Sequence, residues 1–169
     1  MVRKIFLLIF IWLIIGQGCS EEVKMNDQEK LIKAYSMYDE FKDEFKTVVP
    51  ITTEEVKSIK TPITLIDVRE ENEQDISMIP GAITKIEFEK NKDKYKDTLL
   101  ITYCTIGYRS GLYAAELIKN GYSVKNLKGS LLAWVLSGEP VQKNGKEILI
   151  VHVYGKKWNL LPTKYKAIW

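Results

Sequence analysis

Residues 99–111, LLITYCTIGYRSG, place an apolar strand, a cysteine, a short loop and a helix start in direct succession. Residues 99–103 predict a buried strand, and the apolar spacing of residues 111–120 predicts a helix that ends at Gly121. Ligands of open α/β sheets bind just outside the carboxyl ends of the strands. Because Cys104 stands at such an end, we interpret it as a candidate nucleophile.

The loop that follows Cys104 can stabilise negative charge. A loop that runs into a helix N-terminus presents several backbone N–H groups and the positive end of the helix dipole, which favour an anion or a thiolate. Arg109 can in addition hold an oxyanion through two parallel hydrogen bonds, a geometry that lysine lacks. The alternative is a buried, unreactive cysteine, but the glycine and arginine in the loop favour the nucleophile.

The rest of the chain predicts the fold class α/β, with a central parallel sheet covered by helices on both faces. Strands that are apolar throughout and alternate with helices are typical of such a sheet. Pro50 places a short strand near residues 48–51 at an edge or a strand end. Thr52 or Thr53, followed by acidic residues, predicts a capped helix start. Further elements are expected at residues 63–68 and 124–127 (strands) and at residues 131–136 (helix).

Two segments flank this core. The spacing of Leu31, Tyr35 and Tyr38 predicts an amphipathic helix that ends near Thr47 and either docks on the main domain or binds a partner. After residue 142, Asn144-Gly145 predicts a hairpin turn before an apolar strand at residues 148–153. An aromatic-rich end follows, which either packs on the domain, with the N-terminal helix as one expected contact, or forms a docking surface.

The first residues have the pattern of an export signal. Arg3 and Lys4 precede eleven apolar residues, 5–15, fewer than the about 20 that a membrane-spanning helix needs. Residues 15–19, IGQGC, resemble the lipobox of bacterial lipoproteins, although Gly16 stands where an aliphatic residue is usual. We therefore expect an exported protein of the cell envelope, anchored by a lipid on Cys19. Plain secretion and an uncleaved anchor are the alternatives.

Composition excludes several other classes. The net charge of +3 comes without a long basic run, so nucleic acid is not an expected partner. Two cysteines and one histidine are too few for a four-ligand Cys/His zinc site, and we expect no metal and no other cofactor. We interpret His152 as a packed strand residue, with a Cys–His hydrolase pairing as the weaker alternative.

Four segments together resemble the rhodanese-like, single-domain sulfurtransferase family over residues 49–141. Residues 67–70, DVRE, resemble a strand end of the family. Residues 79–82, IPGA, resemble the HIPGA turn of the family. Residues 104–110 resemble its active-site loop, and Gly129-Ser130 with Ala133-Trp134 resembles a helix start. Two departures are Met78, where the family usually has His, and Ser130, where it usually has Gly.

The resemblance implies sulfur transfer through a persulfide on Cys104. Sulfur would come from thiosulfate or a similar sulfane donor and pass to a thiol, a protein acceptor or cyanide. The backbone amides of Thr105, Ile106, Gly107, Tyr108, Arg109 and Ser110 would hold the persulfide, with Arg109 binding the departing sulfite or fixing the loop. Asp67 and Arg69 are expected to support the structure, with direct substrate contact as the alternative.

A rhodanese-like binding or regulatory module without turnover is the main alternative function. A phosphatase is disfavoured because its loop would be one residue longer than the four residues between Cys104 and Arg109. The expected organisation is a signal peptide at 1–18, a tether and helix at 19–47, the rhodanese-like domain at 48–141, and a C-terminal extension packed on it at 142–169.

Overall fold

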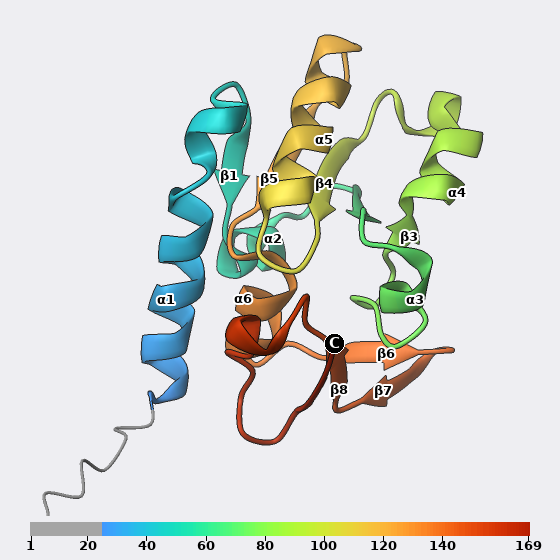
Figure 1. Ribbon diagram of the computed structural model, residues 1–169. Helices are drawn as coiled ribbons and strands as arrows, with labels where there is room; N and C mark the ends of the chain where they lie inside the picture. Colours follow the sequence, from blue (N-terminus) through green and yellow to red (C-terminus); the bar gives the residue numbers. More distant parts are fainter. Residues whose placement is uncertain (1–24) are drawn as a thin grey trace, which may run out of the picture.

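The computed structural model describes residues 25–169 (Figure 1). The expected signal peptide and Cys19 lie outside these residues. Between residues 25 and 169, no helix is both long enough and apolar enough to cross a membrane.

A five-stranded parallel sheet in the order β1-β5-β4-β2-β3 forms the centre of the molecule (Figure 1). This confirms the predicted fold class. The strands are β1 (Val49–Ile51), β2 (Ile63–Asp67), β3 (Ile83–Thr84), β4 (Leu99–Tyr103) and β5 (Val124–Leu127). β1, which contains Pro50, is at an edge as expected, whereas β4 is central. The carboxyl end of β4 therefore opens into a region flanked by neighbouring strand ends.

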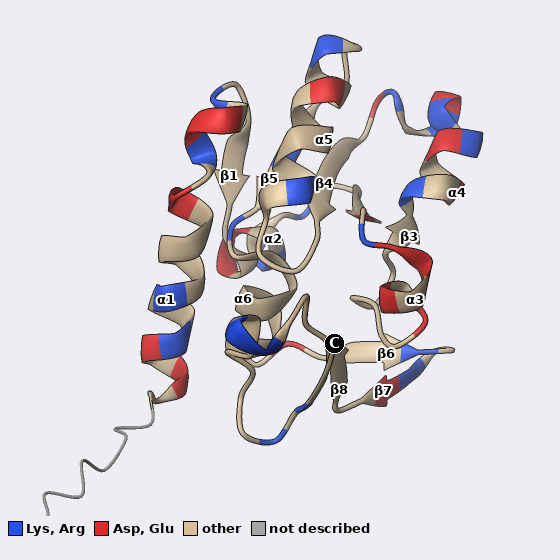
Figure 2. Ribbon diagram, viewed as in Figure 1, with Lys and Arg blue, Asp and Glu red and all other residues tan. Residues whose placement is uncertain are grey.

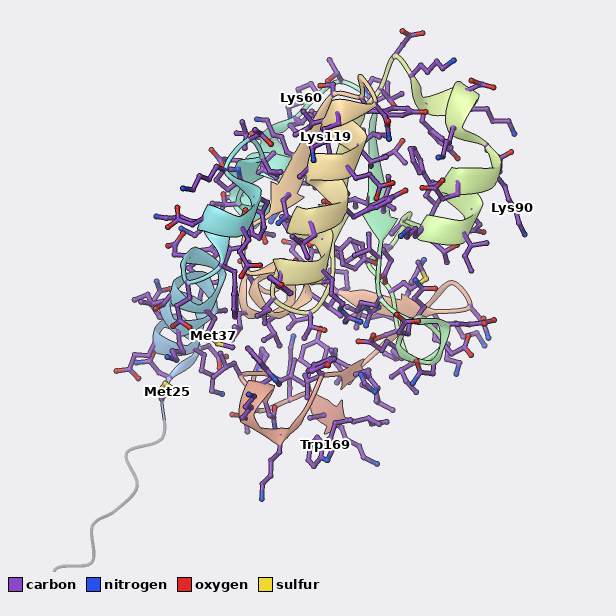
Figure 3. The ribbon with its side chains drawn as sticks, turned by 45° about the horizontal axis from the view of Figure 1, so that its top comes forward. Met25, Met37, Lys60, Lys90, Lys119 and Trp169 are labelled. Carbon is purple, nitrogen blue, oxygen red and sulfur yellow. The ribbon has the colours of Figure 1, made fainter. Side chains whose placement is uncertain are left out.

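Each face of the sheet carries its own apolar cluster, which explains why its strands are apolar on both sides. On one face, Leu100 of β4 packs with α5 (Tyr108–Lys119) and α4 (Lys85–Lys90). On the other face, Ile101 packs with α2 (Thr53–Ser58) and α6 (Ser130–Leu136). Lysines at the element ends, such as Lys60, Lys90 and Lys119, are exposed (Figure 3). Acidic and basic residues are interspersed over the helices (Figure 2).

Short elements follow local capping signals. Thr52 and Glu55 form the predicted capping box of α2 through reciprocal side-chain-to-backbone hydrogen bonds. Thr84 and Glu87 form the same motif at α4. The sequence analysis did not predict β3, α4 or α3 (Glu71–Gln74), which have two, six and four residues. Elements this short carry too few residues for a periodic pattern.

The N-terminal helix is shorter than predicted. α1 spans Asp27–Asp39 and is followed by a separate 3₁₀ turn, Lys42–Phe45, so the expected end near Thr47 is wrong. The break lets Phe45 reach the α5 face of the sheet, where a Cβ on Gly111 would lie 2.6 Å from its ring. Ala34 and Met37, in contrast, join the cluster on the α6 face. α1 therefore docks on the domain mainly against α6.

The C-terminal extension also packs on the domain. β6 (Val141–Lys143) and β7 (Lys146–Ile148) form the predicted hairpin around Asn144-Gly145, both with positive φ. The single strand expected at 148–153 is wrong in its start, because the chain leaves the hairpin at Leu149. β8 (Ile150–His152) then pairs in parallel with β9 (Lys166–Ile168). The buried Leu160, Leu161 and Tyr165 lie in the α6-face cluster, and Lys30 of α1 donates to the Leu161 carbonyl at 2.8 Å.

Candidate active site

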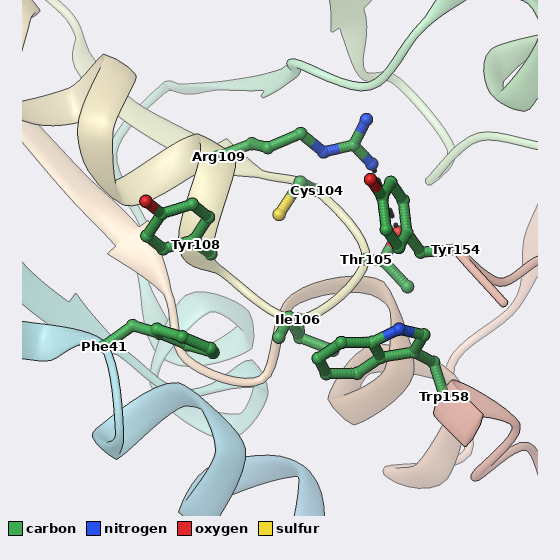
Figure 4. Close-up of a pocket in the computed structure, with 8 residues that line it drawn as sticks. All are labelled: Phe41, Cys104, Thr105, Ile106, Tyr108, Arg109, Tyr154 and Trp158. Atoms are coloured by element: carbon green, nitrogen blue, oxygen red, sulfur yellow. Dashed lines mark hydrogen bonds between the residues drawn. The ribbon is translucent and has the colours of Figure 1, made fainter.

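Cys104 lies on the floor of a cavity of about 390 Å³ at the carboxyl end of β4 (Figure 4). Its exposed fraction is only 2%, so its sulfur is reached through the cavity. The backbone N–H of Gly107 donates to Sγ of Cys104 at 3.2 Å. The structure thus brings one of the predicted loop amides directly to the sulfur. Among the described residues Cys104 has no disulfide partner.

The N-terminus of α6 fixes the beginning of the loop. The N–H groups of Leu131 and Leu132 donate to the carbonyls of Cys104 and Thr105, both at 3.2 Å. The Ser130 hydroxyl accepts the N–H of Cys104 at 3.1 Å and lies 3.1 Å from the Leu127 carbonyl. Ser130 adopts φ 48°, a left-handed conformation that glycine adopts without strain. Its departure from the family pattern therefore adds a side-chain contact to the backbone of Cys104.

Gly107 fixes the tip of the loop. Its φ is 111°, and a Cβ there would lie 2.3 Å from the Tyr38 ring. Asn126 donates from Nδ2 to the Gly107 carbonyl at 2.8 Å. The sequence analysis missed Asn126, although an amide residue inside the short strand 124–127 (VKNL) was a visible signal. A buried amide on a strand usually has such a hydrogen-bonding role.

The helix after the loop begins earlier than predicted, at Tyr108 instead of Gly111. Consequently Tyr108 and Arg109 extend from the first turn of α5 into the cavity, together with Thr105 and Ile106 from the loop. Ser110 does not line the cavity. It is fully buried, and its carbonyl accepts the Thr102 hydroxyl at 3.1 Å.

Arg109 forms a bidentate ion pair that the sequence analysis did not predict. Its Nη1 and Nη2 lie 2.6 and 2.9 Å from the two carboxylate oxygens of Glu73 on α3. Nη2 also donates to the Thr105 hydroxyl at 3.4 Å. Burial tends to lower the pKa of Arg109, but the hydrogen bonds that its guanidinium donates to the Glu73 carboxylate outweigh burial and raise the net pKa. The guanidinium is thus held in place beside Cys104 by a carboxylate.

Glu73 is the centre of a small charged group. Its side chain is 4% exposed, and His152 places Nδ1 3.6 Å from its Oε1. Burial alone would raise the pKa of Glu73, but the Arg109 side chain and the Glu70 N–H lower it to a net value below the ordinary 4.5. His152 belongs to β8 (Ile150–His152), is half-buried and does not line the cavity that contains Cys104.

Glu73→Gln should destabilise the protein by about 1–3 kcal/mol near neutral pH, because it removes the charge that holds Arg109. The folded-state pKa of Glu73 is depressed, so its contribution is complete above 4.5 and is lost as the pH falls through the folded-state value. Urea unfolding of parent and variant between about pH 3 and 7 measures this difference. A difference that stays constant down to the lowest pH would contradict the assignment, and Glu71→Gln, on the exposed side of α3, is the control.

Asp67 and Arg69 support the neighbouring loop and do not line the cavity. Both side chains are fully buried, with Arg69 Nη2 2.6 Å from Asp67 Oδ2. The Arg69 N–H also donates to Asp67 Oδ1 at 3.0 Å, and Nη2 donates to the Ser77 carbonyl at 2.5 Å. These contacts fix the segment between β2 and β3, which carries Glu73.

Three aromatic side chains complete the cavity from outside the loop. Phe41 follows α1, whereas Tyr154 and Trp158 belong to the C-terminal extension (Figure 4). We call these three residues the aromatic wall. The sequence analysis noted the aromatic tail but did not place it at Cys104, since nothing in the sequence gives the path of the chain after β8. No group of three or more His, Cys, Asp or Glu residues suited to a metal occurs within residues 25–169.

Comparison with known proteins agrees with this architecture. The family model described as a rhodanese-like domain matches residues 52–137. The tRNA sulfurtransferase of Desulfurococcus amylolyticus is 32% identical over 105 residues, which are 61% of this chain and 21% of that protein. This chain thus spans about a fifth of that curated relative. The thiosulfate sulfurtransferase of Pseudomonas aeruginosa is 19% identical and superposes with a TM-score of 0.52 over 69% of this chain and 24% of that one, a likeness of fold.

Proposed function

This chain belongs to the rhodanese-like domain family, and from that membership we propose that it transfers sulfane sulfur through a persulfide on Cys104. The observation that carries the proposal is the position of the Cys104 sulfur. It lies on the floor of a cavity, at the carboxyl end of the central strand, and accepts the Gly107 N–H at 3.2 Å. A thiolate and a terminal persulfide sulfur are both anions, and the same backbone dipoles stabilise both.

In the first step, the Cys104 thiolate attacks the outer sulfur of a sulfane donor such as thiosulfate. The new Cys–S bond forms as the donor S–S bond breaks, and sulfite leaves with the electron pair. In the second step, an acceptor thiolate or cyanide attacks the outer sulfur of the persulfide and restores the Cys104 thiolate. No external oxidant or reductant is needed in either step.

The neighbouring residues have separate roles in this proposal. The Gly107 N–H faces the reacting sulfur, while Ser130 and the first amides of α6 keep the loop backbone in position. Arg109 supplies positive charge at the side of the cavity, and Glu73 fixes the direction of its guanidinium. Asp67 and Arg69 act on the fold and not on the sulfur.

Sulfur loading tests the proposal directly. Purified protein that begins after Cys19, incubated with excess thiosulfate, should gain the mass of one sulfur atom, which peptide mapping should locate at Cys104. Cyanide or a small thiol should then remove that mass and release thiocyanate or a persulfide. A folded protein that takes up no sulfur from thiosulfate or from any other sulfane donor would overturn the enzyme and favour the binding module.

A further inference from the structure

The cavity around Cys104 takes part of its lining from segments outside the family match. Phe41, Tyr154 and Trp158, the aromatic wall, all lie outside residues 52–137. With Ile106 and Tyr108 they give the cavity over the Cys104 sulfur much of its apolar lining (Figure 4), and Tyr154, at its outer side, is 66% exposed. The two extensions of this chain therefore supply part of the surface that faces the sulfur.

Contacts within and around the wall hold it in place. The Phe41 and Tyr108 rings are tilted with centroids 4.9 Å apart, and the Tyr108 hydroxyl donates to Glu44 at 2.9 Å. The Tyr154 and Trp158 rings meet edge to face at 6.5 Å. Each arrangement is one that aromatic pairs favour. The segment that carries Tyr154 and Trp158 is anchored on both sides by buried apolar residues: Val151, Val153, Leu160 and Leu161.

The charge in the cavity favours a singly charged donor over a small dianion such as thiosulfate. Among the described residues that line it, Arg109 alone is charged, and both of its terminal nitrogens bind the Glu73 carboxylate. The Tyr154 ring covers the guanidinium, with Cζ 5.5 Å from the ring centroid. A doubly charged donor would lose its hydration on entry and meet a cation whose charge is already balanced.

The volume of the cavity fits an organic molecule. At about 390 Å³ it lies within the range of roughly 300–1,000 Å³ that small-molecule sites occupy. Such sites combine apolar and aromatic walls with a few polar groups, which here are the Cys104 sulfur, the Thr105 hydroxyl and Arg109.

We infer that the sulfur carrier of this protein is an organic sulfane compound or thiol whose body is a planar, apolar ring system that packs against the aromatic wall. The inference rests on the proposed sulfur transfer and defines its substrate class. The carrier R–S–S⁻ would give its outer sulfur to the Cys104 thiolate: the Cys–S bond forms, the S–S bond of the carrier breaks, and R–S⁻ leaves. In the reverse direction, R–S⁻ attacks the outer sulfur of a Cys104 persulfide that another sulfane donor has formed: the S–S bond of the carrier forms, the Cys–S–S bond breaks, and the Cys104 thiolate is restored.

Two probe donors that differ only in their organic group test whether an aromatic ring on the donor favours sulfur loading. The benzenethiosulfonate and methanethiosulfonate anions carry the same charge and the same kind of sulfane sulfur. When the Cys104 thiolate takes the outer sulfur of either anion, the S–S bond of the donor breaks and a sulfinate leaves. The parent protein should have a kcat/KM for the benzene compound about tenfold higher than for the methane compound, mainly through KM, because the ring is buried against aromatic side chains.

Trp158→Leu should bring that ratio close to one, since it keeps apolar volume but removes the planar ring. Trp158→Phe should restore most of the ratio. Trp169→Ala is the matched control, because Trp169 is 60% exposed, does not line the cavity and projects from the end of the chain (Figure 3). Thermal unfolding of each variant verifies that it is folded at the assay temperature.

The outcomes distinguish a failure of the proposed carrier class from a failure of the proposed sulfur transfer. Equal loading by both donors in the parent, or a ratio that Trp158→Leu leaves unchanged, would overturn the carrier class while sulfur transfer itself stands. Absence of loading by both donors and by thiosulfate would overturn the proposed function, and the carrier class with it. A ratio that falls in Trp158→Leu and persists in Trp169→Ala supports the inference.

Discussion

Cys104→Ser should take up no detectable sulfur from thiosulfate, which means a loading rate lower than that of the parent protein by on the order of a thousandfold or more. A hydroxyl is a far weaker nucleophile than a thiolate, and it cannot form a persulfide. The exchange is nearly isosteric, so the 2% exposed side chain should still fit its site and the Gly107 N–H should still find an acceptor. Mass spectrometry of the intact protein after incubation with thiosulfate measures the result.

The second cysteine of the sequence provides the control. Cys19→Ser in the full chain removes the only other cysteine of the sequence and should leave sulfur loading at Cys104 unchanged. If the Cys104→Ser variant still gained the mass of one sulfur atom, the sulfur would have to attach to another residue. That result would remove Cys104 from the mechanism. A loss of the folded state in Cys104→Ser, detected by circular dichroism, is separated from a loss of chemistry by measuring loading per folded molecule.

The parts of the site that sequence predicts are those encoded by contiguous residues. Residues 99–111 contain the buried strand, the cysteine, the glycine of the loop and the arginine, so their order alone places Cys104 at a strand end beside a helix. The strand β4 was predicted with its observed bounds, Leu99–Tyr103. The same local logic predicts the hairpin at Asn144-Gly145 and the capping box at Thr52, because each is set by a few neighbouring residues.

The parts that sequence missed depend on tertiary contacts between distant segments. Glu73 lies 36 residues before Arg109 in the chain, and only the position of α3 beside the end of β4 brings their charges together. The sequence around a glutamate in a polar stretch does not distinguish a solvent-exposed side chain from one that is buried in an ion pair. Tyr154 and Trp158 were visible as aromatic residues, but their place over Cys104 depends on the pairing of β8 with β9.

Asp67→Ala should lower the free energy of unfolding by about 3–5 kcal/mol, the largest stability effect expected here. Asp67 and Arg69 have fully buried side chains joined at 2.6 Å, and Asp67 also accepts the Arg69 N–H. Removal of the carboxylate leaves the guanidinium buried with only the Ser77 carbonyl as a polar partner among its described contacts. Urea-induced unfolding, followed by circular dichroism, measures the loss.

A double-mutant cycle with Arg69→Met separates the ion pair from the backbone contacts. If the cost of Asp67→Ala comes from the unpaired guanidinium, the double variant should be more stable than Asp67→Ala alone, because it buries no uncompensated charge. Sulfur loading per folded molecule should stay near the parent value in every variant, since neither residue lines the cavity. A loading rate that falls at least tenfold in a variant with parental stability would instead indicate direct substrate contact. The absence of such a fall, together with the lost stability, would assign Asp67 and Arg69 to the stability of the segment between β2 and β3.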